Sequence, residues 1–202
     1  NETEVDNILK KKKFFPKINK YIDLHAYKKN GGYDILKKCL SNKISRAKVI
    51  KTLKNSNLKG LGGAGFPTGL KWELTKKEPA PRLMAVNADE GEPGTFKDRF
   101  CMETDPHRFL EGTLIGAWVV DAKACYIYLR DEYPFINKIL KDEIKKIENE
   151  GLVKHCKLII RRGAGAYICG EESAMLESIE GKRGYPRHKP PFPVQEGLFG
   201  RP

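Results

Sequence analysis

The acidic loop Asn87-Ala88-Asp89-Glu90-Gly91-Glu92-Pro93-Gly94-Thr95-Phe96-Lys97-Asp98-Arg99 directly follows a short apolar run, Leu83-Met84-Ala85-Val86. The apolar run is typical of a buried strand. The loop places one amide and three carboxylates within six residues of the end of that strand, and acids that are neither solvated nor paired cost stability. Taken alone, the loop has two interpretations: a solvated, inert loop with a Pro-Gly turn, or a binding site carried on a loop.

Two glycine-rich loops flank the acidic loop in sequence. The first glycine loop is Gly60-Leu61-Gly62-Gly63-Ala64-Gly65-Phe66-Pro67-Thr68-Gly69-Leu70-Lys71-Trp72, and the second is Arg162-Gly163-Ala164-Gly165-Ala166-Tyr167-Ile168-Cys169-Gly170-Glu171-Glu172. Glycines let backbone N–H groups approach a phosphate or a ring without an intervening Cβ. The first loop satisfies G-x-G-x-x-G but follows an expected helix, so the Rossmann context is lacking. The three loops together predict a nucleotide or flavin site.

The hydrophobic pattern predicts an α/β fold with a Rossmann-like parallel sheet. Strands are predicted over residues 82–86, 123–130 and 157–161, and helices are predicted to begin at Asp105-Pro106, at Pro134 and at Glu171-Glu172. Strands that alternate with helices imply a parallel sheet with crossovers. The acidic loop and the second glycine loop then lie at strand carboxyl ends, where open α/β sheets bind ligands. This placement favours a binding site over an inert loop.

The N-terminal part differs from the rest in composition. We expect residues 1–57 to form a basic, largely helical segment and residues 58–202 to form the binding domain. Residues 1–20 are polar, contain Pro16 and are predicted to be extended or partly disordered. A short helix is expected over residues 33–40, and Ser45 is expected to cap another that ends near Asn55.

Charge and cysteine usage limit the partners. The net charge is +12, but residues 1–60 alone contain 16 Lys and Arg against 5 Asp and Glu, which leaves the remainder nearly neutral. This distribution argues against nucleic acid; the basic segment is either solvated or docks on an acidic partner. No apolar run approaches the roughly 20 residues that span a bilayer, so membrane insertion is not expected. Five cysteines without a C-x-x-C pair predict no metal site in this stretch and a reducing, cytoplasmic location.

The three loops, followed by Lys189-Pro190-Pro191-Phe192-Pro193, resemble the FMN- and NADH-binding flavoprotein subunit of respiratory complex I. The same module is shared with the beta (diaphorase) subunit of NAD-dependent molybdenum formate dehydrogenases and with NAD-reducing hydrogenases. The resemblance runs from about residue 21 to the end. Three short motifs are most similar to the formate dehydrogenase branch: Asp131-Glu132-Tyr133-Pro134, Glu172-Ser173-Ala174-Met175 and Pro186-Arg187-His188.

The resemblance implies two sets of binding residues. FMN would be held by Gly60, Gly62, Gly63, Ala64, Gly65, Lys71, Asn87, Asp89, Glu90, Gly170 and Glu171. The nicotinamide nucleotide would be held by Phe66, Glu92, Tyr167, Glu172, Lys189 and Phe192. From the residues alone, Lys71 is either a phosphate contact or a surface lysine, and residues 182–193 either contact a nucleotide or form a linker. Leu61 and Leu74 depart from the family, which often has an arginine and an aromatic residue there.

The implied function is hydride transfer between NAD(H) and FMN, with single electrons passing to or from iron–sulfur clusters. No catalytic acid is implied beyond cofactor positioning, although Glu92 is a candidate for limiting how tightly product is held. The 4Fe-4S cluster motif of the family would lie beyond Pro202. Implied partners are a 2Fe-2S thioredoxin-like subunit and a molybdenum/iron–sulfur subunit. Alternatives are complex I, peripheral to the membrane, an NAD-reducing hydrogenase, or a non-catalytic nucleotide-sensing or assembly module.

Overall fold

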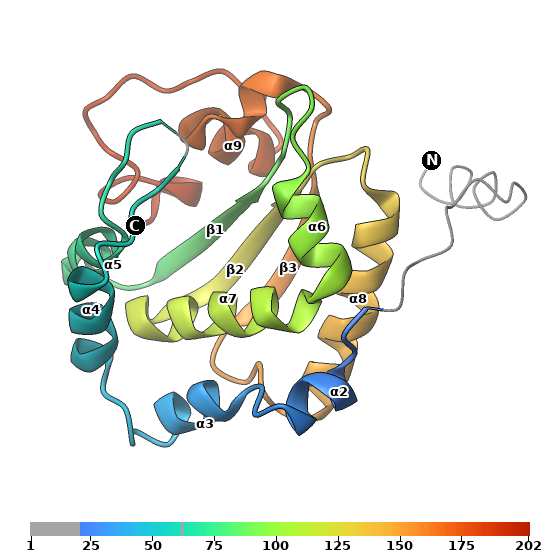
Figure 1. The fold of residues 1–202 in the computed structure, drawn as a ribbon. Coiled ribbons are helices and arrows are strands. Elements are labelled where there is room, and N and C mark those ends of the chain that lie inside the picture. The colour runs from blue at the N-terminus through green and yellow to red at the C-terminus, as the bar shows by residue number, and fades with distance from the viewer. Residues whose placement is uncertain (1–20, 62) are drawn as a thin grey trace, which may run out of the picture.

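The computed structural model of this chain describes residues 21–61 and 63–202 (Figure 1). The lead-in predicted over residues 1–20 and the predicted FMN residue Gly62 lie outside the described residues. None of the described helices is both long and apolar enough to cross a membrane.

A three-stranded parallel sheet forms the centre of the fold. Its strands are β1 (Arg82–Ala88), β2 (Ala122–Leu129) and β3 (Lys157–Arg162), arranged in the order β1-β2-β3. In the register of the sheet, Val86 lies opposite Ile127, which lies opposite Ile160. The predicted parallel α/β architecture is therefore confirmed, and all three strands end on the same side of the molecule.

Helices cover both faces of the sheet (Figure 1). The crossover helices α7 (Pro106–Val120) and α8 (Pro134–Asn149) pack with Ile127 in the main core. The neighbouring residue Tyr128 faces the other side, where α9 (Glu172–Ile179) and η2 (Leu198–Gly200) pack in a second cluster. This alternation follows from the two-residue period of a strand. Because both faces are covered, the exposed route to the sheet is at its ends and edges.

Local capping signals fix several helix starts where the sequence predicts them. Asp105 accepts a hydrogen bond from Arg108 N at the start of α7, and Pro106 occupies the first turn. Ser45 accepts one from Lys48 N at the start of α4 (Arg46–Asn55). These side chains satisfy N–H groups that have no partner within the helix.

The N-terminal helices α2 (Leu24–Lys29) and α3 (Asp34–Leu40) pack along α7. Tyr33 and Leu36 are fully buried in the main core. The Tyr33 hydroxyl lies 2.8 Å from His107 Nδ1, and His107 Nε2 lies 2.8 Å from Glu143 Oε2, so a buried polar chain ties α3 to α7 and α8. The helical character of this segment agrees with the sequence, whereas its division from the rest at residue 57 stays a prediction.

Two helices beside the acidic loop were not anticipated from the sequence. Helix α5 (Thr68–Lys77) follows the first glycine loop, and α6 (Lys97–Thr104) follows the acidic loop. Neither has a capping side chain at its N-cap residue. Gly69 lets α5 approach α4 closely, since a Cβ there would lie 2.8 Å from Lys54 N.

Candidate functional site

A cleft of about 540 Å³ opens at the carboxyl ends of the strands. It brings together the acidic loop, the second glycine loop and Leu61 of the first glycine loop. The residues that line it are Leu61, Asn87, Asp89, Glu90, Gly91, Glu92, Thr95, Lys97, Asp98, Tyr167, Ile168, Gly170 and Glu171. Three segments that are distant in sequence therefore meet where a parallel α/β sheet binds its ligands.

Asn87 and Asp89 differ in their hydrogen bonding within the acidic loop. Asn87 Nδ2 donates to Gly170 O at 2.8 Å, and its Oδ1 accepts from Asp89 N at 3.0 Å, so its amide joins the two loops. The Asp89 carboxylate has no hydrogen-bond or ion-pair partner among the described residues. Burial raises the pKa of Asp89, with a further upward contribution from Glu132. A half-buried carboxylate without a donor is well suited to accept a hydrogen bond from a ligand.

Glu90 is buried, with 5% of its surface exposed. Its carboxylate accepts from Asp98 N at 3.0 Å and Arg99 N at 3.1 Å, at the start of α6. Burial alone would raise the pKa of Glu90, but these N–H groups and the Tyr133 hydroxyl hold it below the ordinary value. The carboxylate therefore takes the place of the missing cap of α6 and stabilises the wall of the cleft.

Arg130 and Tyr133, which follow the carboxyl end of β2, also hold Glu90 in place. Arg130 Nη1 donates to the Glu90 carbonyl, and Tyr133 donates to Glu90 Oε2 at 3.1 Å. The Arg130 guanidinium also lies 5.5 Å from the centre of the Tyr133 ring. These two residues were missed from the sequence, although their position just after a predicted strand was a usable signal.

Hydrogen bonds to Tyr128 of β2 hold the second glycine loop, which continues into α9. The buried Tyr128 hydroxyl accepts from Ala164 N at 2.9 Å and lies 2.8 Å from Ser178 Oγ. Glu171 caps α9 by accepting from Ser173 N and Ala174 N, each at 2.9 Å. Burial alone would raise the pKa of Glu171. Hydrogen bonds from Ser173 and the Ala174 N–H, together with the Lys189 ammonium, lower this pKa below its ordinary value. Gly170, a predicted FMN residue, lines the cleft beside the acidic loop.

The first glycine loop is closed at its base. Gly60 N donates to Phe66 O and Thr68 N donates to Leu58 O, both at 3.0 Å. Gly63 and Gly65 have positive φ angles of 100° and 59°, which glycine adopts readily. Leu61 is 94% exposed and is the residue of this loop that lines the cleft.

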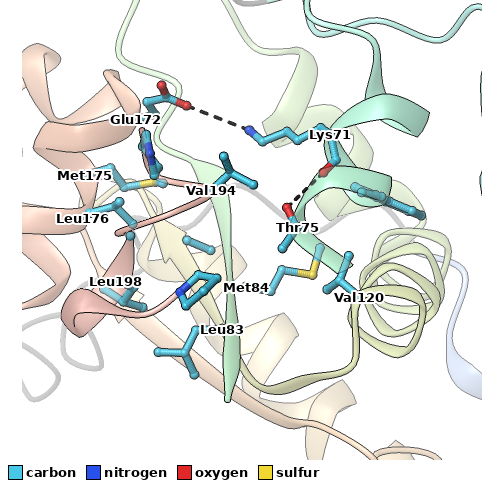
Figure 2. Close-up of a pocket in the computed structure, with 15 residues that line it drawn as sticks. Lys71, Thr75, Leu83, Met84, Val120, Glu172, Met175, Leu176, Val194 and Leu198 are labelled. Atoms are coloured by element: carbon cyan, nitrogen blue, oxygen red, sulfur yellow. Dashed lines mark hydrogen bonds and ion pairs between the residues drawn. The ribbon is translucent and has the colours of Figure 1, made fainter. Parts of the chain in front are cut away.

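Lys71 does not line the cleft. Figure 2 shows it at the end of a neighbouring, mostly apolar pocket of about 220 Å³, reaching toward Glu172 at 3.9 Å. Lys189 lies 2.7 Å from Glu172 and 3.1 Å from Glu171. The predicted FMN residue Lys71 and the predicted nucleotide residue Lys189 thus meet at the first turn of α9, which separates the pocket from the cleft.

The remaining predicted nucleotide residues are exposed. Tyr167 donates to Glu92 Oε1 at 3.3 Å across the mouth of the cleft. Phe66 and Phe192 expose about half of their surface, 45% and 52%, but neither lines the cleft or the pocket of Figure 2. Within the described residues no group of three or more His, Cys, Asp or Glu side chains is placed to hold a metal ion.

The parallel sheet and its loop-lined cleft define an α/β domain with a cleft at its strand ends, where open α/β sheets bind ligands. The family that matches is the Nuo51 FMN-binding domain, over residues 53–199, and the chain belongs to this family. An NADH-quinone oxidoreductase subunit of Aquifex aeolicus (strain VF5) is 46% identical over 209 residues, covering 100% of this chain and 48% of that protein. The mitochondrial NADH dehydrogenase (ubiquinone) flavoprotein 1 of Dictyostelium discoideum is 47% identical over 165 residues, covering 76% and 34%.

Solved structures agree with the sequence relatives. The crystal structure of an NAD+-reducing NiFe hydrogenase in the H2-reduced state matches with a TM-score of 0.81 and 32% identity, covering 100% of this chain and 38% of that chain. The predicted family resemblance is therefore confirmed. The chain spans about half the length of its bacterial relative, 48%, and a smaller share of the other two.

Proposed function

We propose that this chain binds FMN and NAD(H) and is the hydride-transferring part of a diaphorase-type oxidoreductase subunit. The observation that carries the proposal is the single cleft in which the acidic loop meets both glycine loops. Membership of the Nuo51 FMN-binding domain family supports FMN as the cofactor. The relatives named as NADH dehydrogenase subunits support NAD(H) as its redox partner.

The backbone around the cleft fits a flat cofactor. Gly63 and Gly65 of the first glycine loop do not line the cleft, and an added Cβ at either would meet nothing within 4 Å, so the space beside this loop is open. At Gly170 the nearest atom to such a Cβ is Asp89 O at 3.6 Å, on the acidic loop. Space that no protein atom fills, bordered by backbone from two loops, supports close approach of a ligand ring or phosphate.

Each group has a distinct task in this proposal. FMN, when bound, supplies the hydride chemistry that amino-acid side chains lack. The Asp89 carboxylate accepts a hydrogen bond from the cofactor, while Asn87 and Glu90 hold the loop that presents it. Lys71 and Lys189 provide positive charge for phosphates, in competition with Glu172. Glu92 and Tyr167 face the nucleotide at the mouth of the cleft.

The test uses glycines whose substitution the folded chain tolerates. A Cβ at Gly60 or Gly170 makes only ordinary contacts, at 3.9 and 3.6 Å, so Gly60→Ala and Gly170→Ala should fold. Each is expected to weaken FMN binding about tenfold or more, because the methyl group occupies space the cofactor needs. Gly112→Ala is the matched control, since a Cβ there meets nothing within 4 Å on α7. Flavin absorption after reconstitution measures retention, and equal retention by all three variants contradicts the placement.

The finer setting is also a proposal. Three motifs, Asp131 to Pro134, Glu172 to Met175 and Pro186 to His188, favour the beta subunit of an NAD-dependent formate dehydrogenase. The curated relatives instead carry the names of NADH-quinone oxidoreductase subunits. Co-purification decides between them: a molybdenum/iron–sulfur subunit together with a 2Fe-2S thioredoxin-like subunit supports formate dehydrogenase, and quinone-reducing subunits support complex I. Full-length protein that folds without flavin bands would support the non-catalytic alternative.

A further inference from the structure

The outer edge of β3 is free in the part of the chain that the structure describes, because β3 pairs only with β2. Figure 1 shows β3 on the side of the sheet away from β1, next to α8. A groove of about 400 Å³ lies at the carboxyl-terminal half of this edge. It is lined by Asn137 and Lys141 of α8, by Ile160, Arg161 and Arg162 of β3, and by the end of α9 together with Phe199. Arg162 is already paired with Asp131 at 2.6 Å.

The available charge in this groove is positive. Neither the Lys141 ammonium nor the Arg161 guanidinium has an ion-pair partner among the described residues. The only acid lining the groove, Glu180, is 6% exposed and is already used by Lys182 and Arg187, each at 2.7 Å. Glu180 also accepts from Phe199 N at 2.7 Å. An occupant of the groove therefore meets two cations without counter-charges.

One buried acceptor in the groove lacks a donor. Asn137 Oδ1 is inaccessible to solvent and has no hydrogen-bond partner among the described residues. This acceptor is closed to the groove, so the acceptors that an occupant can reach are the main-chain carbonyls on the free edge of β3. Phosphate oxygens would suit the cations but offer few donors, whereas a polypeptide backbone supplies one N–H per residue.

We propose that the β3 edge binds an extended, acidic polypeptide segment of a partner protein. The segment adds to the sheet as a strand, with main-chain hydrogen bonds to β3 and carboxylates toward Lys141 and Arg161. Cations at a sheet edge also serve to block aggregation, but that role does not require a groove. The proposal concerns a surface remote from the cofactor cleft and does not depend on FMN binding.

The probe is a fluorescein-labelled peptide in which Glu and Val alternate, titrated into the whole chain by fluorescence anisotropy at low salt. Binding is expected to weaken as salt screens the charges. Lys141→Glu and Arg161→Glu are each expected to weaken it about tenfold, whereas Lys38→Glu on α3, with the same change in charge, leaves it unchanged.

One further peptide and one inorganic competitor distinguish the occupants. An N-methylated version of the probe keeps its carboxylates but loses backbone donors, and it is expected to bind poorly. Equal binding of the methylated probe, or full competition by inorganic phosphate, would make the groove an anion site and overturn strand addition. If Lys141→Glu and Arg161→Glu increase self-association without weakening peptide binding, the cations only protect the edge and the proposal fails. Equal loss of binding in Lys38→Glu overturns it as well.

Discussion

At the scale of single residues, acids that look alike in sequence have different tasks. Glu90 turns both carboxylate oxygens toward the backbone of α6. The carboxylate of Glu92, two residues later, accepts from Tyr167 alone among the described residues. A high density of acids in the sequence indicates a site. It does not tell which carboxylate already accepts hydrogen bonds from the protein's own backbone. The donors that decide this belong to α6 and to the second glycine loop, and only folding brings them together.

We expect Glu90→Gln to lower the free energy of unfolding by about 1 to 3 kcal/mol, because a neutral amide loses charge-assisted bonds to Asp98 N and Arg99 N. The pKa of Glu90 lies below its ordinary value in the folded chain. The stability it contributes is therefore full above the unfolded pKa of about 4.5 and is lost as pH falls through the lower folded pKa. Denaturant unfolding of both proteins from pH 7 downward measures this. A difference that grows toward acid would contradict the assignment.

Glu92→Gln tests the same loop on its ligand side. Its carboxylate is exposed and bonded only to Tyr167 at 3.3 Å, so the variant should keep wild-type stability and FMN content. Nucleotide release is expected to slow, because loss of one negative charge near the dinucleotide phosphates removes a repulsion. Stopped-flow dissociation of NAD+ from the flavin-loaded protein follows the effect. Loss of FMN with unchanged release would show that Glu92 faces the flavin instead.

At the scale of elements, the carboxylate of Glu111 on α7 holds the start of α3. It accepts from Tyr33 N at 2.9 Å, Leu36 N at 3.2 Å and the Tyr27 hydroxyl at 2.6 Å. Glu111→Gln turns one acceptor into a donor facing these groups and is expected to cost about 2 kcal/mol. Amide exchange over residues 34–40 should accelerate more than exchange in β2. Glu148→Gln, an exposed change on α8, is the control, and uniform acceleration across the chain would mean that Glu111 is not specific to α3.

Elements whose signals are local could be predicted from the sequence, and those with distant partners could not. The start of helix α7 could be predicted because Asp105 and Pro106 lie at its own first turn and cap it. Helix α6 gives no such signal because its cap is Glu90, which lies on the far side of the Pro-Gly turn. Helix α5 is hard to predict because it contains Gly69 and is only weakly amphipathic. Its position depends on close packing against α4.

The candidate site shows the same difference between features with local signals and features that depend on distant partners. Its location could be predicted, because the ends of parallel strands must gather on one side of the sheet. The separation of Lys71 from the cleft could not, because it depends on where α5 packs against α4. Tyr133 belongs to a motif that indicated only the branch of the family, and the contacts of Arg130 and Tyr133 with Glu90 are visible only once β2 lies beside β1.

At the scale of the whole molecule, the chain presents a binding cleft but, within the described residues, no cluster of metal-ligating side chains. Cys169 is the cysteine nearest the proposed flavin, in the second glycine loop. It is 2% exposed and packs beneath that loop, where a Cβ on Gly184 would lie 2.5 Å from its sulfur. Cys125 and Cys156 are buried, and burial raises the pKa of each thiol, to about 11 for Cys156. The raised pKa values of Cys125 and Cys156 disfavour the thiolates that iron ligation requires.

We therefore expect that this 202-residue chain, loaded with FMN, takes up hydride from NADH but does not itself assemble an iron–sulfur cluster. Electrons that leave the flavin singly then need a cluster from another part of the assembly. The test is anaerobic reconstitution with iron and sulfide, followed by electron paramagnetic resonance after reduction, with Cys169→Ala and the exposed Cys101→Ala in parallel. A stoichiometric cluster signal that disappears only in Cys169→Ala would place a metal site in the second glycine loop, because buried packing alone cannot produce it. A weak signal lost equally in both variants would indicate adventitious iron, and the absence of a resident cluster would stand.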